Sequence, residues 1–524
     1  MGACTLLSNQ KDVLLPFYTD FKSAEGWSLD AGATFDASVS ATAGSGSIRL
    51  EKSGNNWVTS DRITSDFKLP VKAGMSYTLS FKSKTNTFPP PLLEVYGAML
   101  GDSGVIDNSN GTKCANAQKG VWEENYVIIR IPKNSAIKYF KIKILMMPKE
   151  SISAPVWIDD LKFEEGVHLP HASPKKAFSG KNIRIDKLGN IEIKKDGKFI
   201  PFFPIGIYTD ENRADWRIYK EMGFNLNMWA SDAASIAKSK RAGLYSMMQI
   251  VQYIVPVGED WIPQNPEKKS AHLKKTIGQI RSAGLWDNLL FYYVDNEFYH
   301  LKHSFTDTID QVRSLDQGSH PIYMLSGAYG MARMYNRYID FTGTYVAEDG
   351  YETPIVENLR VLDTTPDQKQ PVVFAQINRG IGKNFRAIVY GALAEGARGI
   401  GFWRDGGSAG RIEKRLIYKQ LPTISKEIRE MLPLLRTATE TAWQLHCDNH
   451  SLITGSRTLQ HEGYVIISNP TSIRQHTTCQ IEALPYHAKH VKSYSGDQIV
   501  AKIDHDSFSL TMDPYDAKVI RLAQ

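Results

Sequence analysis

The chain has 524 residues, of which 42% are hydrophobic and 23% are charged. Because a single hydrophobic core rarely grows beyond about 250–300 residues, this length predicts two or three domains. The net charge of +6 is spread along the chain without a basic stripe or a nucleic-acid-binding motif, so nucleic acid is excluded as the expected partner. The small positive excess fits either an ordinary solvated surface or a mild preference for an anionic polysaccharide.

The four cysteines stand at positions 4, 114, 447 and 479 and lack the close spacing of a metal site. Cys447 and Cys479 could form a disulfide, which the sequence alone does not decide. Cys4 follows Gly2-Ala3 and resembles the end of a bacterial lipoprotein signal, although the chain has no apolar signal-peptide core. We therefore expect an exported protein, either secreted or anchored at the cell surface or in the periplasm through a lipid on Cys4. The alternative is an incidental thiol near the terminus.

Residues 1–167 have the pattern of an all-β domain. Short runs alternate between apolar and polar residues, as in YTLSF at 77–81 and YFKIKI at 139–144, and Gly, Asn, Asp and Pro separate them. The region ends in VWIDDLKF at 156–163. These runs resemble the jelly-roll β-sandwiches of carbohydrate-binding modules. The resemblance implies either a sugar-binding domain or a spacer, and by family analogy it allows a structural Ca²⁺ ion in this sandwich.

Residues 168–438 are predicted to hold a linker, a β-hairpin and a barrel. Proline and serine mark the linker at 168–179, and turns at Gly189 and Gly197 mark the hairpin. Eight short apolar strands then alternate with helical segments, which is the pattern of a parallel sheet with crossover helices. We expect these strands at 202–208, 224–229, 244–250, 289–294, 322–325, 341–346, 372–377 and 399–403. No run of about 18 apolar residues occurs anywhere, so no membrane span is predicted.

Residues 439–524 return to a β pattern, as in YVIISNP at 464–470, and resemble the small sandwich that often follows a glycosidase barrel. The predicted fold class is therefore α/β, a (β/α)8 TIM barrel flanked by two all-β sandwich domains. The alternative, an open doubly wound sheet, would usually carry a glycine-rich loop after its first strand, and residues 206–210 do not form one.

The chemistry of such a barrel is expected at the C-terminal ends of its strands. The fourth predicted strand runs into Asp295-Asn296-Glu297. This ending resembles the clan A glycoside hydrolases, whose acid/base is a Glu preceded by Asn at the end of strand four. The resemblance implies that Glu297 is the proton donor and that Asn296 binds a sugar hydroxyl. Burial beside Tyr292 and Tyr293 would raise the pKa of Glu297 and keep it protonated.

Clan A also requires a carboxylate at the end of strand seven, where this sequence has Gln376 in PVVFAQIN at 371–378. Three interpretations remain open. Gln376 is an engineered replacement of a Glu nucleophile, which would imply a retaining enzyme, or it is natural and another carboxylate serves, or the protein only binds sugar. The following GALAEGARGIGFW at 391–403 resembles barrel hydrolases with a natural Gln, so we favour the second interpretation.

Other strand ends supply the remaining candidates. Glu348, after the sixth strand, is the first choice for the second carboxylate, and Asp405, after the eighth, is the second choice. Trp403 resembles the tryptophan that forms the floor of the −1 subsite in clan A enzymes. The other predicted substrate-binding residues are Tyr208, Trp229, Gln249, Tyr253 and Tyr345, although Trp229 and Tyr253 could equally be packing residues.

No metal or other cofactor is expected at the catalytic site, because Glu297, His300 and His303 have no second ligand cluster to complete a zinc site. The sequence therefore predicts an exported, endo-acting glycoside hydrolase that cleaves a polysaccharide or oligosaccharide. Two alternatives stay open: a catalytically inactive sugar-binding barrel, and a structural or adhesive surface protein.

Overall fold

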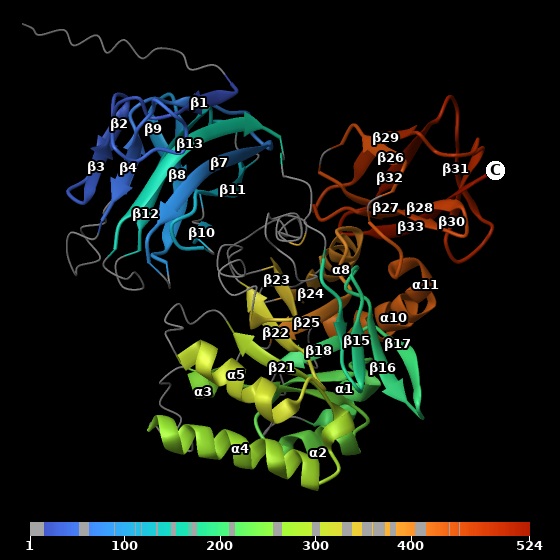
Figure 1. Cartoon of the computed structure of the whole chain (residues 1–524). Helices are drawn as coiled ribbons and strands as arrows, with labels where there is room; N and C mark the ends of the chain where they lie inside the picture. The colour runs from blue at the N-terminus through green and yellow to red at the C-terminus, as the bar shows by residue number, and fades with distance from the viewer. Residues whose placement is uncertain are drawn as a thin grey trace, which may run out of the picture. The chain divides into compact units, whose positions relative to one another are not determined.

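The computed structural model describes residues 15–51, 62–87, 90–109, 112–116, 118–132, 135–147, 154–166, 168, 175–208, 215–254, 265–295, 304–326, 338–347, 359, 372–377, 384–403, 416–439, 441–449 and 451–524. The residues described divide into two compact units, one before residue 174 and one after it. In Figure 1 the first unit is coloured from blue to teal and the second from green to red.

The first unit is a sandwich of two antiparallel sheets, as the alternating runs predict. One sheet contains β1 (Phe17–Thr19), β3 (Ala33–Asp36), β4 (Ser47–Leu50), β7 (Ser76–Thr85), β11 (Glu123–Arg130) and β13 (Val156–Glu165). The other contains β2 (Trp27–Leu29), β5 (Arg62–Ser65), β6 (Leu69–Pro70), β8 (Leu93–Gly101), β9 (Gly104–Asn108), β10 (Thr112–Cys114) and β12 (Tyr139–Met146).

Stacked aromatic rings hold the two sheets together. Phe163 of β13 stacks on Phe140 of β12 with ring centroids 5.7 Å apart, and Tyr77 of β7 stacks on Phe163 at 5.2 Å. All three side chains are fully buried. The alternation in each strand thus places one face in a shared core, which is why this sequence forms a sandwich.

The second unit begins with a small antiparallel sheet of β14 (Phe178–Ser179), β15 (Ile183–Ile185), β16 (Ile191–Lys195) and β17 (Lys198–Phe202). The predicted turns are present, with positive φ at Gly189, Asp196 and Gly197. The isoleucines of β15 and β16 are buried in the same apolar cluster as the barrel interior. This sheet therefore adds to the core of the barrel.

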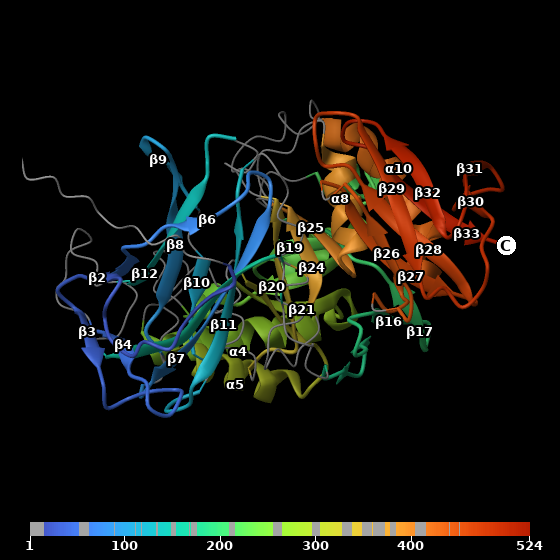
Figure 2. The same cartoon turned by 90° about the horizontal axis from the view of Figure 1, so that it is seen from above.

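The barrel is closed and consists of eight parallel strands, which confirms the predicted fold class. They are β18 (Ile205–Tyr208), β19 (Leu226–Ala230), β20 (Tyr245–Gln249), β21 (Leu289–Asp295), β22 (Ile322–Ser326), β23 (Phe341–Ala347), β24 (Val372–Ile377) and β25 (Gly399–Trp403). Closure comes from the pairing of β18 with β25. Figure 2 shows part of the barrel from above, with β19, β20, β21, β24 and β25 labelled. Every predicted barrel strand is present, with ends that differ by a few residues.

The helices described around the barrel follow the same alternation. They are α1 (Trp216–Glu221), α2 (Ala233–Arg241), α3 (Val251–Ile254), α4 (Pro266–Ser282), the 3-10 turn η1 (Trp286–Asn288), α5 (Ser304–Asp316), α8 (Phe385–Ala394), α10 (Leu416–Glu430) and α11 (Leu432–Leu435). Local capping explains several starts. Asp232 forms a capping box with Ser235 at α2, and Asn265 caps α4 just before Pro266.

The C-terminal strands form two further antiparallel sheets around one core. The first contains β26 (Gln444–Cys447), β29 (Gln475–Glu482) and β32 (Ser507–Met512). The second contains β27 (Ile453–Leu459), β28 (Glu462–Ser468), β30 (His490–Ser493), β31 (Ile499–Lys502) and β33 (Ala517–Ala523). The chain is therefore a (β/α)8 barrel with antiparallel sheets on both sides of it in sequence.

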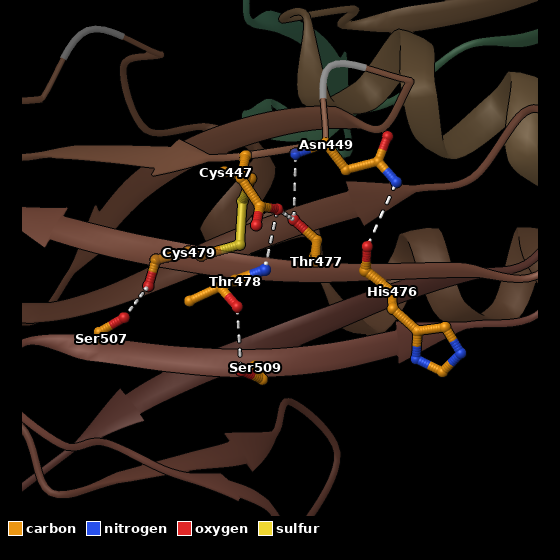
Figure 3. The surroundings of a disulfide bond; sticks show 9 residues. Cys447, Asn449, His476, Thr477, Thr478, Cys479, Ser507 and Ser509 are labelled. Atoms are coloured by element: carbon orange, nitrogen blue, oxygen red, sulfur yellow. Dashed lines mark hydrogen bonds between the residues drawn. A yellow bond between two sulfur atoms is a disulfide. The ribbon is translucent and has the colours of Figure 1, made fainter.

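A disulfide joins Cys447 to Cys479, directly opposite each other on β26 and β29 (Figure 3). The sequence left this pairing open, and strand register decides it by placing the two Cα atoms 4.0 Å apart. Beside it, Asp448 accepts hydrogen bonds from the Thr477 hydroxyl and the Thr478 backbone. The pair links the N-terminal strand of this domain to its core.

Candidate active site at the ends of the barrel strands

Most of the predicted site residues stand where the barrel strands end. Six of them lie within the last three residues of a strand: Tyr208, Trp229, Gln249, Tyr345, Gln376 and Trp403. Because the strands are parallel and the barrel is closed, these ends share one rim. The barrel therefore brings together positions that are far apart in the sequence.

Strand register sets the neighbours along part of this rim. Tyr208 pairs with Trp403 across β18 and β25. Gln376 of β24 pairs with Tyr345 of β23 on one side and with Gly401 of β25 on the other. The backbone thus places the ends of β23, β24, β25 and β18 next to one another. The side chains of Gln376 and Trp403 are outside the described part of the structure.

The predicted acid, Glu297, and its neighbour Asn296 also lie outside the described residues, as do Glu348 and Asp405. The structure does describe the strand that precedes each of these residues in sequence. β21, the fourth strand of the barrel, ends at Asp295, and β23 and β25, the sixth and eighth, end at Ala347 and Trp403.

Aromatic rings fill the barrel interior near the C-terminal ends. Tyr293 of β21 stacks on Tyr323 of β22 with ring centroids 5.3 Å apart, and both side chains are fully buried. Tyr208 meets Tyr293 edge-on at 6.1 Å. The two buried rings exclude water from this part of the interior.

Tyr292, expected beside Glu297, instead points to the outside of the barrel, because successive residues of a strand face opposite sides. Its hydroxyl donates to Asp316 at the end of α5, at 3.1 Å, and Asp316 also bonds to the ring of His320 at 2.7 Å. Burial raises the pKa of Tyr292 well above its usual range. Tyr292 therefore fastens β21 to the helical layer.

Trp229 reaches the rim through an irregularity in β19. Leu226 and Met228 belong to the interior cluster, so strict alternation would turn Trp229 outward. The register between β19 and β20 shifts at this point, however, and the Trp229 ring lies at 4.1 Å from the Tyr208 ring, edge to face. Both rings are partly exposed. They form an aromatic corner at the ends of β18 and β19.

Gln249 and Tyr253 follow each other closely in sequence but differ in role. Gln249 is fully buried, and its Nε2 donates to the Met228 carbonyl at 3.3 Å. Among the residues that the structure describes, none forms a hydrogen bond with its Oε1. Tyr253 lies in α3, and its hydroxyl bonds to His272 of α4 at 3.1 Å. Burial raises the pKa of Tyr253 to about 12. The contacts of Tyr253 are those of a helix-packing residue.

Sequence reasoning missed Tyr323 and Asn227. Tyr323 could have been found, because it stands inside an apolar strand where its ring must face either the interior or the helices. Asn227 carries no such signal. It is fully buried in β19, and its role depends on contacts to a backbone and a helix that the sequence does not place.

The described residues contain no group of three or more His, Cys, Asp or Glu side chains placed to hold a metal ion. In the N-terminal sandwich, Asp159 accepts from the Ala41 backbone at 2.7 Å, and Asp160 pairs with Lys82 at 2.7 Å. Both carboxylates thus already have protein donors as partners. A Ca²⁺ ion is held by six to eight oxygen ligands, and its presence in this sandwich stays a prediction. None of the helices described is long and apolar enough to cross a membrane.

Comparison with known proteins gives distant structural similarities. No protein-family model and no curated protein sequence matches the chain. An α-amylase from Anoxybacillus is similar over 61% of this chain and 98% of its own, at 13% identity and a TM-score of 0.42. A GH30 endoxylanase from Clostridium papyrosolvens is similar over 62% and 97%, at 8% identity and a TM-score of 0.39.

A third similarity involves the CBM22-2 xylan-binding domain from Paenibacillus barcinonensis. It covers 29% of this chain and 99% of that domain, at 11% identity and a TM-score of 0.24. All three TM-scores lie below 0.5, so these similarities say nothing about activity or ligand. The function of this chain must therefore be inferred from the residues and geometry of its barrel.

Proposed function

We propose that the protein is an endo-acting glycoside hydrolase that cleaves a polysaccharide or oligosaccharide, with Glu297 as general acid. The observation that carries the proposal is the closure of the barrel, which makes β21 the fourth strand. Asn296 and Glu297 follow its last residue, Asp295, directly. Catalytic residues of such barrels come from the C-terminal ends of the strands.

The chemistry requires an acid at this point. The glycosidic oxygen is a poor leaving group, so a carboxylic acid must protonate it as the bond breaks. The buried rings of Tyr293 and Tyr323 supply a water-poor interior that favours the protonated form of a nearby carboxyl group. The Tyr208–Trp229 corner and the buried amide of Gln249 are proposed to bind the sugar.

The second carboxylate is proposed to be Glu348, with Asp405 as the other candidate. Gln376 stands on the seventh strand and its amide cannot act as nucleophile or base. β23 and β25, which precede the two candidates, both pair with β24. A separation of about 5–5.5 Å from Glu297 would imply a retaining reaction, and about 6.5–9.5 Å an inverting one.

We also propose that the protein is exported, either secreted or held by a lipid on Cys4. The disulfide between Cys447 and Cys479 supports export, because disulfides persist in oxidising compartments. Cys4 itself lies outside the described residues.

The decisive experiment is hydrolysis of a polysaccharide panel by the wild type and by Glu297→Gln. We expect loss of kcat by about 10²–10⁴-fold, because the substituted amide cannot donate a proton to the leaving group. Glu221→Gln is the matched control: Glu221 is exposed at the end of α1 and should leave the rate unchanged. A silent Glu297→Gln change, or a wild type that cleaves no glycan, would overturn the proposal.

A second candidate function is a barrel that binds sugar without cleaving it. Gln376 favours this function because it stands where a catalytic carboxylate is expected. Such a protein would bind a glycan of the panel in isothermal titration calorimetry, release no reducing ends from it, and bind it equally well after Glu297→Gln. Binding and hydrolysis measured on the same panel therefore separate the two functions.

A further inference from the structure

The irregularity in β19 is a β-bulge next to the proposed sugar site. Asn227 pairs with Ser246 of β20, and the next pair is Ala230 with Met248. β19 therefore advances by three residues while β20 advances by two, which leaves one extra residue on β19. A bulge of this kind re-aims the side chains that follow it and often lies beside an active site.

The side chain of Asn227 links the bulge to helix α2. Its Oδ1 accepts from the backbone N–H of Trp229 at 2.8 Å. Its Nδ2 donates to the hydroxyl of Ser239, on α2, at 2.9 Å. Asn227 is fully buried, so no water competes for these bonds. An Asn side chain that bonds the N–H two residues on fixes the local chain direction much as a turn does.

The consequence is the direction of the Trp229 ring. Without the extra residue, Trp229 would follow interior Met228 onto the outer face of the sheet. With it, the ring meets Tyr208 at an angle of 78° and a centroid distance of 4.1 Å, and both rings stay partly exposed. Two rings at nearly right angles present one face and one edge to a ligand.

We propose that Asn227 is a positioning residue of the sugar site: it holds the β19 bulge, and the bulge sets Trp229 against Tyr208 as a wall for a sugar ring. The substrate part of this statement rests on the proposed glycosidase function. The positioning part stands on the hydrogen bonds and the register alone. Asn227 acts through Trp229 and touches no substrate.

The test uses the full chain labelled with 5-fluorotryptophan and followed by ¹⁹F NMR. The chain has 10 tryptophans, and Trp229→Phe assigns the resonance of Trp229 by its loss. Asn227→Ala removes both bonds of the side chain. Ser239→Ala is the matched control, because it removes only the bond to α2, and Asn227→Asp keeps an acceptor for the Trp229 N–H.

We expect Asn227→Ala to move the Trp229 resonance, and Ser239→Ala and Asn227→Asp to leave it in place. An unmoved resonance in Asn227→Ala, or an equal shift in Ser239→Ala, would overturn the positioning role. If Asn227→Ala does not fold, Asn227→Asp decides: a displaced Trp229 resonance there contradicts the proposal, and an undisturbed one supports it.

The second readout is kinetic, on whichever panel substrate the wild type cleaves fastest. Asn227→Ala should raise KM by about 5–10-fold with little change in kcat, since a misplaced ring loses about 1 kcal/mol of stacking. Ser239→Ala should match the wild type. A moved resonance with an unchanged KM would remove the substrate part of the proposal. If the wild type cleaves no glycan of the panel, the proposed function is wrong. The NMR comparison then still decides whether Asn227 positions Trp229.

Discussion

At the scale of single residues, the reaction depends on where the second carboxylate comes from. Gln376 occupies the seventh strand, where a carboxylate is expected, and an amide can neither attack the sugar nor accept a proton from water. The strands that pair with β24 are β23 and β25. In sequence, Glu348 directly follows the last residue of β23, and Asp405 stands two residues after the last residue of β25.

We predict that Glu348→Gln lowers kcat by about 10²–10⁴-fold, whereas Asp405→Asn has a smaller effect. Initial rates on the best panel substrate measure both. Azide should restore activity to a Glu348→Ala variant if Glu348 is a nucleophile, with a glycosyl azide as product. Near-normal rates in Glu348→Gln, with loss of activity in Asp405→Asn, would reverse the assignment.

At the scale of elements, the C-terminal sheets are fastened to the barrel through α8. Arg457 of β27 is fully buried and donates to the Leu393 and Ala394 carbonyls at the end of α8, at 2.7 and 3.3 Å. Its burial lowers the pKa of Arg457 to about 9. Gly455 lies against the same turn, where an added Cβ would collide with the Ala394 carbonyl. The contact thus needs both a donor and a glycine.

Gly455→Ala is predicted to lower stability by about 1–3 kcal/mol, because the carbonyl that it meets is backbone and cannot rotate away. The matched control is Gly278→Ala on the exposed face of α4, where nothing lies within 4 Å. That change should raise stability by about 0.5–1 kcal/mol through helix propensity. Thermal unfolding measures both. Equal shifts in the same direction would contradict the packing argument.

At the scale of the whole molecule, the chain holds two units with separate cores. The first is the two-sheet sandwich, and the second contains the barrel with its small sheet and the C-terminal sheets. The N-terminal sequence left sugar binding and a spacer role open for the sandwich. A sugar-binding sandwich would strengthen binding to a polymeric substrate, whereas a spacer would not. Neither role would change the cleavage of a short substrate.

We predict that a fragment of residues 174–524 cleaves short oligosaccharides at a rate close to that of the full chain. Binding to insoluble polysaccharide should weaken about tenfold, or 1.4 kcal/mol, because a second linked binding site adds avidity. A pull-down with the insoluble polymer and a reducing-sugar assay measure the two effects. Equal polymer binding by the fragment and the full chain would assign the sandwich a spacer role.

The sequence by itself determined the eight barrel strands and the all-β character of both flanking regions. These features are local: apolar runs, alternation and turn residues such as Gly189 and Gly197 act within a few residues. It also determined which residues follow each strand. The predicted ends of most strands are close to those observed, which is why six predicted site residues lie on the rim.

Only the tertiary structure decided which way individual side chains face and what they contact. The bulge that turns Trp229 inward is a mismatch between β19 and β20, and neither strand shows it alone. Tyr292 and Tyr253 were expected near the site, yet their hydroxyls bond to Asp316 and His272 in the helical layer. The Cys447–Cys479 pair depends on the register of β26 against β29. Each outcome depends on contacts between segments distant in sequence, which local patterns do not encode.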